Sequence, residues 1–231
     1  MTESLRQFRD GFLDLLLDFL WREWTALGVA GQPSRPVRHA VDPEALFLFT
    51  CALGLHDQRL FDEMLDWMTV NGRFLNIQRL RNLIRSGEPC GGPVVPAVAD
   101  WMARWEHSPR WRPLAGPTRR AGGNTPLFLL PDGRPLPVTG DRDPVFLSHG
   151  LERNAVVLRR LSGAFHADAP SCLLLRLRAL FGVGARADAL AVIAVRQVAE
   201  LHVAGLRHEA VDDAVEGDIV IFAIAHQLLD L

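Results

Sequence analysis

Lysine and tyrosine are absent from this 231-residue chain, and cysteine is scarce. All 25 basic residues are therefore arginine, and against 27 acidic residues they leave a formal net charge of −2. A chain so close to neutral has no global attraction for nucleic acid or for an anionic membrane. The 3 cysteines, Cys51, Cys90 and Cys172, form no CxxC pair. This spacing argues against a metal site or a disulfide framework and favours buried thiols in a reducing cytoplasm.

Long apolar runs and catalytic motifs are missing as well. The most apolar stretch, 11–21, is broken by Asp14 and Asp18 and is too short to span a bilayer. The first residues do not resemble a secretory signal. The histidines form no HxxxH or HExxH pair, and no acid pair, P-loop or nucleophile elbow occurs. We therefore expect a cytoplasmic protein that is not an enzyme and has no cofactor, metal or membrane partner.

The first half of the chain carries a helical pattern. In residues 4–28 apolar side chains recur every three or four positions before Gly28 ends the run. This broad stripe consists of Phe8, Phe12, Leu15, Leu16, Phe19, Leu20 and Trp24, and we expect it to form the interface of a homodimer. Asp42-Pro43 and Asp57 predict the starts of two more helices, and apolar spacing predicts others over 77–85 and 95–105. We expect a helical domain at 1–106.

The middle of the chain has a different composition. Proline and glycine become frequent from residue 107, and the stretch 107–131 contains no acid but holds Arg110, Arg112, Arg119 and Arg120. Two short apolar runs, 127–130 and 136–138, flank Pro131-Asp132-Gly133, which predicts a small β-hairpin. Its prolines predict an edge ribbon with poor pairing. We expect 107–169 to be a connector that contains this hairpin.

Helical periodicity returns after Pro170. Leu173–Phe181 and Ala185–Val195 predict two helices, and Gly182–Ala187 between them matches a GxGxxA dinucleotide fingerprint. That fingerprint requires a buried strand before it, whereas Arg176 and Arg178 interrupt this run, and the chain shows no βαβ alternation. A turn between two helices is the better interpretation; a small-molecule enzyme that uses this turn is the least favoured function.

The segment VAELHVAGLRHEAVDDAV, residues 198–215, has the spacing of a helix-turn-helix. Gly205 takes the place of the turn glycine, Ala204 and Leu206 flank it, and Val211 follows on the inner face of the second helix. One departure lies upstream, where Leu201 stands at a position that favours a small residue. Together with LRLRALFGVGARAD, residues 175–188, this segment resembles the DNA-binding domain of bacterial winged-helix regulators, and more narrowly a bacterial group with such a domain behind a helical N-terminal half.

The resemblance implies a transcriptional regulator that binds double-stranded DNA as a dimer. It predicts DNA contacts from Arg207 and His208 of the second helix and from Arg186 and Arg196, and the connector arginines Arg110, Arg112, Arg119 and Arg120 would supply phosphate contacts. The resemblance also predicts a β-hairpin wing after Val215, where one apolar run at 219–225 leaves room for at most a truncated one.

The charge of this domain opposes the leading hypothesis. Residues 169–231 carry 5 arginines against 8 acids, and Asp212 and Asp213 lie on the outward side of the presumed recognition helix. The alternative is a protein-interaction module built on a degenerate helix-turn-helix that no longer binds DNA. In either case we expect a mainly α fold, in which the helical domain at 1–106 and the connector at 107–169 precede a helix-turn-helix-like domain at 170–231.

Overall fold

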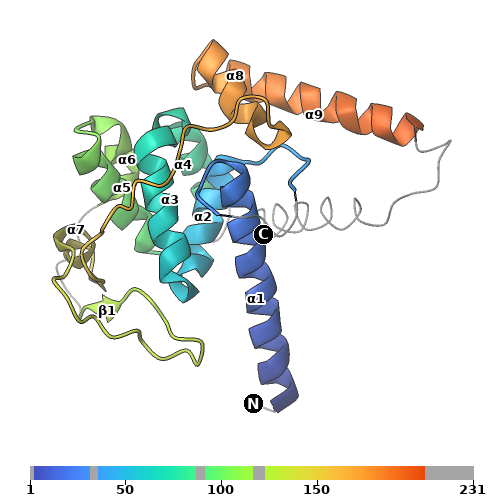
Figure 1. The fold of residues 1–231 in the computed structure, drawn as a ribbon. Helices are drawn as coiled ribbons and strands as arrows, with labels where there is room; N and C mark the ends of the chain where they lie inside the picture. The colour runs from blue at the N-terminus through green and yellow to red at the C-terminus, as the bar shows by residue number, and fades with distance from the viewer. Residues whose placement is uncertain (1–2, 32–35, 87–91, 117–122, 206–231) are drawn as a thin grey trace.

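The structure, a computed structural model, describes residues 3–31, 36–86, 92–116 and 123–205, and it is mainly helical, as the sequence predicts. The longer helices are α1 (Glu3–Ala26), α2 (Pro43–Leu53), α3 (Gln58–Asn71), α4 (Ile77–Ser86), α5 (Val94–Trp105), α8 (Leu173–Phe181) and α9 (Ala185–Gly205), shown in Figure 1. The shorter helices are α6 (Arg112–Ala115) and α7 (Pro144–Ser148). Single 3₁₀ turns lie at Gly54–His56, Gly72–Phe74, Pro109–Trp111 and Pro170–Cys172.

Aspartate side chains begin α2 and α3, as the sequence predicts. Asp42 Oδ1 accepts hydrogen bonds from the backbone amides of Glu44 and Ala45 at 3.1 and 3.0 Å. Asp57 Oδ1 accepts one from the amide of Leu60 at 3.0 Å. These bonds satisfy amides that have no partner within the helix.

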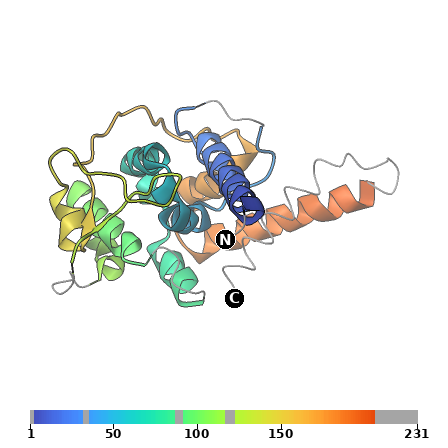
Figure 2. The ribbon, with the colours of Figure 1, turned by 90° about the horizontal axis from the view of Figure 1, so that it is seen from below.

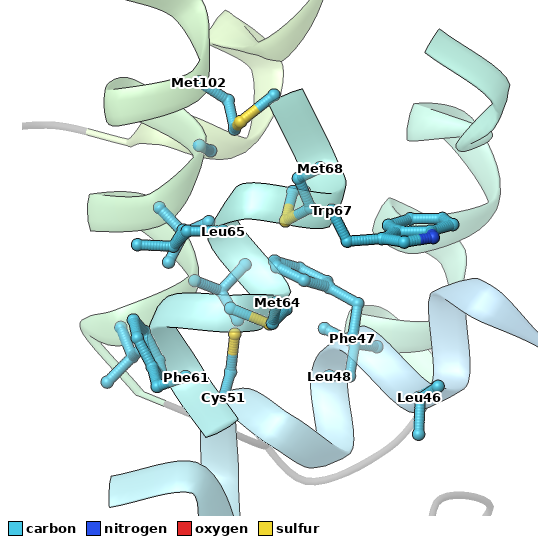
Figure 3. Close-up of a cluster of buried hydrophobic side chains, with 14 of the residues drawn as sticks. Leu46, Phe47, Leu48, Cys51, Phe61, Met64, Leu65, Trp67, Met68 and Met102 are labelled. Carbon is cyan, nitrogen blue, oxygen red and sulfur yellow. The ribbon is translucent and has the colours of Figure 1, made fainter. Parts of the chain in front are cut away.

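The core lies around α3, which packs between α2 and α5. Figure 3 shows Phe61, Met64 and Leu65 of α3 beside Cys51 of α2 and Met102 of α5; all five side chains are fully buried. Two tryptophans extend this core to α1. The Trp24 and Trp67 rings meet edge to face at 5.1 Å, and their indole N–H groups donate to Thr50 Oγ1 and the Leu27 carbonyl.

One buried cluster contains side chains from all three predicted domains. Trp24 and Met64 come from 1–106, Phe128 and Phe146 from 107–169, and Leu175 from 170–231. The rings of Phe128 and Phe146 both lie edge to face against Phe61 of α3. The domain boundaries stay a prediction, but the described parts of the three ranges share this core.

The connector contains a tight turn and a pairing that the sequence did not predict. At the expected hairpin, Leu130 N donates to the Arg134 carbonyl at 2.7 Å, Leu136 N donates to the Phe128 carbonyl at 2.8 Å, and Gly133 adopts a positive φ of 82°. A single antiparallel bridge joins Leu129 to Pro135, consistent with a poorly paired ribbon. The named strands instead form a parallel pair, β1 (Thr125–Pro126) with β2 (Leu151–Glu152).

An extended segment, residues 153–165, crosses the bundle along α3; we call it the strap (Figure 1). Asp66 of α3 accepts the backbone amides of Arg160, Leu161 and Ser162 at 2.9–3.0 Å. At the last residue of α3, Asn71 donates to the Gly163 carbonyl at 2.9 Å and accepts from the Phe165 amide at 3.3 Å. Side chains of α3 therefore replace the strand partner that this backbone lacks.

Ion pairs from α3 also hold the strap. Arg153 Nη2 donates to Asp62 Oδ1 at 2.6 Å. The Arg153 guanidinium also lies 5.0–5.8 Å from the ring centroids of Phe61, Phe128 and Phe146. Arg159 pairs with Glu63 at 3.1 Å. Glu63 is buried and its Oε2 has no hydrogen-bond partner, so burial raises the pKa of this carboxyl above its ordinary 4.5, against the attraction of Arg159.

A buried arginine attaches α8 and α9 to the bundle. Arg178 of α8, fully buried, donates to both carboxylate oxygens of Glu44 at 2.5 and 3.0 Å and to Asp188 of α9 at 2.8 and 3.0 Å. A fifth bond reaches the Phe74 carbonyl at 2.9 Å. Arg79 of α4 pairs with Glu44 and Asp42, although the sequence pattern places Arg79 on the outer side of α4. Four helices therefore meet at one ionic cluster.

The C-terminal helices agree only in part with the expected helix-turn-helix. α8 ends at Phe181, Gly182 adopts a positive φ of 81°, and α9 begins at Ala185. Gly182–Gly184 is therefore a turn between two helices, and a helix instead of a strand precedes it. The prediction of a separate helix ending near Val195 is wrong, because α9 continues without interruption to Gly205. The second helix of the motif and the wing lie outside the described residues.

We predict that removing the buried cation unfolds the protein far more readily than removing an exposed one. Arg178→Ala leaves Glu44 with one cationic partner and Asp188 with none, so it should lower the free energy of unfolding by about 3–5 kcal/mol in urea titrations. The matched control Arg186→Ala, on the exposed surface of α9, should stay within about 0.5 kcal/mol of wild type. Equal losses in the two variants would contradict this role for Arg178.

A second prediction concerns pH. Because the folded pKa of Glu63 is raised, the folded state binds its proton more tightly than the unfolded state does. The resulting contribution to stability is complete below pH 4.5 and is lost as the pH rises through the folded pKa. Glu63→Gln lacks this loss, so urea titrations should find its unfolding free energy rising relative to wild type between pH 4 and pH 7. A pH-independent difference would show that Glu63 has no raised pKa.

Candidate interaction surface

Ser148 and His149, adjacent in sequence, do not face each other as a nucleophile and its base would. His149 Nε2 lies 3.3 Å from Asp100 Oδ2, while the neighbouring Ser148 hydroxyl donates to the Val145 carbonyl at 2.7 Å. A nucleophile must instead face its base. Within the described ranges, no three histidine, cysteine or acidic side chains gather as a metal site would require. The described helices also include none that is long and apolar enough to cross a membrane.

The exposed apolar side chains of α1 are the clearest surface feature. Figure 1 shows the N-terminal part of α1 extending beyond the other helices, and Figure 2 shows it from below. Here Leu5, Phe8, Phe12 and Leu15 are 58, 72, 53 and 70 % exposed. The Phe8 and Phe12 rings stack on each other with centroids 6.1 Å apart. Such large apolar groups clustered on one helix mark a contact surface.

α1 changes the side on which it is apolar at its midpoint. At 100° per residue, Leu5, Phe8, Phe12 and Leu15 centre on one direction, whereas the buried Leu20 and Trp24 centre about 120° further round the helix. The second half packs against the body, and Leu17 is the first side chain of α1 that contacts the core. The continuous stripe predicted from sequence is therefore two stripes, one buried and one exposed, and the change of phase is readable in the spacing.

The described part of α9 is also apolar on its outer side. Ala187 and Ala191 face inward and are buried, while Leu190, Val192, Ile193 and Val195 are 36–54 % exposed. At the tip between α8 and α9, Leu180, Phe181 and Val183 are 42–70 % exposed. A helix that is apolar on both its inner and outer sides usually has neighbours on both.

The arginines predicted to contact DNA do not form one surface where the structure describes them. Arg186 and Arg196 are exposed on α9. Arg112 is exposed on α6, which lies on the other side of the molecule in both Figure 1 and Figure 2. Arg110 points inward: its Nη2 donates to the Gly72 and Leu75 carbonyls at 2.6 and 3.2 Å. The remaining predicted contacts, Arg119, Arg120, Arg207 and His208, lie outside the described residues.

Arg110 shows why local composition was a poor guide. The acid-free stretch around it suggested a flexible basic arm, but Arg110 also stacks over Trp111 at 5.0 Å and lies 3.7 Å from Glu106. The acid that balances Arg110 is Glu106, which directly follows α5 and lies one residue before that stretch. The exposed half of α1 was not predicted from sequence as a surface separate from the core, although the phase of the apolar spacing is the signal that marks it.

No protein-family model, curated protein or solved structure matches this chain.

Proposed function

We propose that this chain is a cytoplasmic protein-interaction protein that docks a partner helix on the exposed half of α1. The observation that carries the proposal is the exposure of Leu5, Phe8, Phe12 and Leu15 on a helix that projects beyond the body. The proposal shares with the sequence-based alternative only the class of protein-interaction module, because it sets the docking surface on α1 instead of on a degenerate helix-turn-helix, and it includes no enzymatic activity. The cytoplasmic location is supported by Cys51 and Cys172, which are buried free thiols, and burial raises the pKa of both.

The energetics favour a partner over permanent exposure. Burying one Phe or Leu side chain contributes about 1.5–3 kcal/mol, and four such side chains follow one another on α1. Their spacing of three, four and three residues is that of a helix seam that packs against another helix. The folded body does not need this surface, because the Trp24 and Trp67 contacts already attach the second half of α1.

DNA binding by a dimeric transcriptional regulator is a second candidate. Arg186 and Arg196 favour it, since both are exposed on α9, which leads to the predicted recognition helix. Against it stand the inward position of Arg110 and the apolar side chains Val192 and Ile193 between the two exposed cations. DNA interfaces are more polar and more positively charged than this surface.

The primary proposal predicts a covalent adduct at position 8. A photo-crosslinking phenylalanine analogue placed at Phe8 in living cells should give one discrete protein adduct, because a docked helix lies within reach of that ring. The same analogue at Val157 is the matched control, since this side chain is 75 % exposed on the strap, away from α1. An adduct at neither position, or equal adducts at both, would contradict the proposal.

The DNA candidate predicts a loss of salt dependence. If Arg186 and Arg196 each contact a phosphate, replacing either by alanine should reduce the slope of log K against log salt by about 0.9. The measurement is a fluorescence-anisotropy titration of duplex DNA at several salt concentrations, with Arg112→Ala as the control on the other side of the molecule. Slopes unchanged in the α9 variants would exclude these contacts.

A further inference from the structure

We propose that the helix docked on α1 is α1 of a second copy, running in the opposite direction. This inference rests on the proposed function and names its partner. The result is a two-fold dimer in which the exposed halves of two α1 helices pair and the two bodies lie at opposite ends.

The exposed row is self-complementary when it is reversed. Read in either direction, its members follow the order Leu, Phe, Phe, Leu with spacings of three, four and three. A reversed copy therefore sets Leu5 beside Leu15 of the second copy and Phe8 beside Phe12 of the second copy, in four matched layers. A two-fold interface requires this property, because the same patch must serve on both chains.

The position of the body favours the reversed direction. Core contacts of α1 begin at Leu17, and Leu20 is the first of its side chains to be fully buried. In the reversed pair, residue 17 of the second copy reaches the level of residue 3, beyond Leu5. All four layers therefore lie ahead of the first core-packed side chain of either copy. A parallel copy would bring both bodies to the same end of the pair.

The helix dipoles point the same way. Two α1 helices in a reversed pair have opposed dipoles, whereas a parallel pair sets like ends side by side.

Sedimentation equilibrium of the full chain tests the partner. Wild type should dimerise with concentration, and Phe8→Glu with Phe12→Glu should weaken the dimer more than about tenfold, because each copy loses apolar contacts at the centre. Both side chains are more than half exposed in the single chain, so the variant should keep its fold, which circular dichroism checks. Val157→Glu is the matched control and should dimerise like wild type. A monomeric wild type, or equal dimerisation of both variants, would overturn the inference.

Spin labels test the direction. Labels at Ser4→Cys and, separately, Gly11→Cys in a Cys90→Ser background lie on one flank of the row, and a Cβ at Gly11 meets no atom within 4 Å. In the reversed pair the two labels at position 4 lie about 18 Å apart along the axis and those at position 11 about 3 Å apart, at 1.5 Å per residue. Equal separations at the two positions would mean a parallel pair and overturn the arrangement.

Photo-crosslinking at Phe8 and sedimentation equilibrium distinguish failure of the proposed function from failure of the second copy as partner. An adduct at Phe8 that joins this chain to a different protein, together with a monomeric chain in sedimentation, would leave the proposed function standing and exclude the second copy as partner. Absence of any adduct together with a monomeric chain would overturn both.

Discussion

The contact between Arg178 and Glu44 fixes how α8 and α9 pack against the N-terminal helices. These side chains are 134 residues apart, both fully buried, and Arg178 also binds Asp188 at the start of α9. Burial raises the pKa of Glu44, and the hydrogen bonds from Arg178 oppose that rise. A buried charge without its partner is strongly destabilising, so α2, α4, α8 and α9 have to adopt one mutual arrangement. The orientation of α9, and with it the exposure of Arg186 and Arg196, follows from this cluster.

Local signals in the sequence predicted the helices well. Aspartate at the starts of α2 and α3, proline at the start of α2, and apolar spacing in α4, α5 and α8 are properties of a few adjacent residues, and the structure confirms the helices that they predict. The glycine turn at 182–184 was predicted for the same reason. The extension of α9 to Gly205 was not predicted, because the helix-turn-helix motif requires a break near residue 196, whereas Ala194, Arg196 and Gln197 are strong helix formers that favour continuation.

Local signals could not predict which residues far apart in the sequence pair with each other. Arg178 lies 134 residues from Glu44, and the strap groups that bind Asp62 and Asp66 lie more than 90 residues from them. No local pattern marks these residues as partners. The parallel pair β1 and β2 involves two residues in each strand, too few for any periodicity. The prediction that the aromatic face of α1 is an interface can still apply to the exposed first half of the helix, because the second half is part of the core. The buried Trp24 and Leu20 belong to the core because a neighbouring helix covers them.

Because the strap follows α3 by more than 80 residues, α3 is synthesised well before its partners on the strap. The carboxylate of Asp66 and the amide of Asn71 lie on α3, and the backbone groups that satisfy them are 92–96 residues further along the chain. At 5–20 residues per second, a ribosome needs about 5–20 s to add that length. During this interval α3 can already pack against α2 and α5, but it still exposes polar groups that the finished fold buries. We expect the bundle to remain loosely closed until the strap emerges, so a chain stalled in its middle third presents a partly open core to chaperones and proteases.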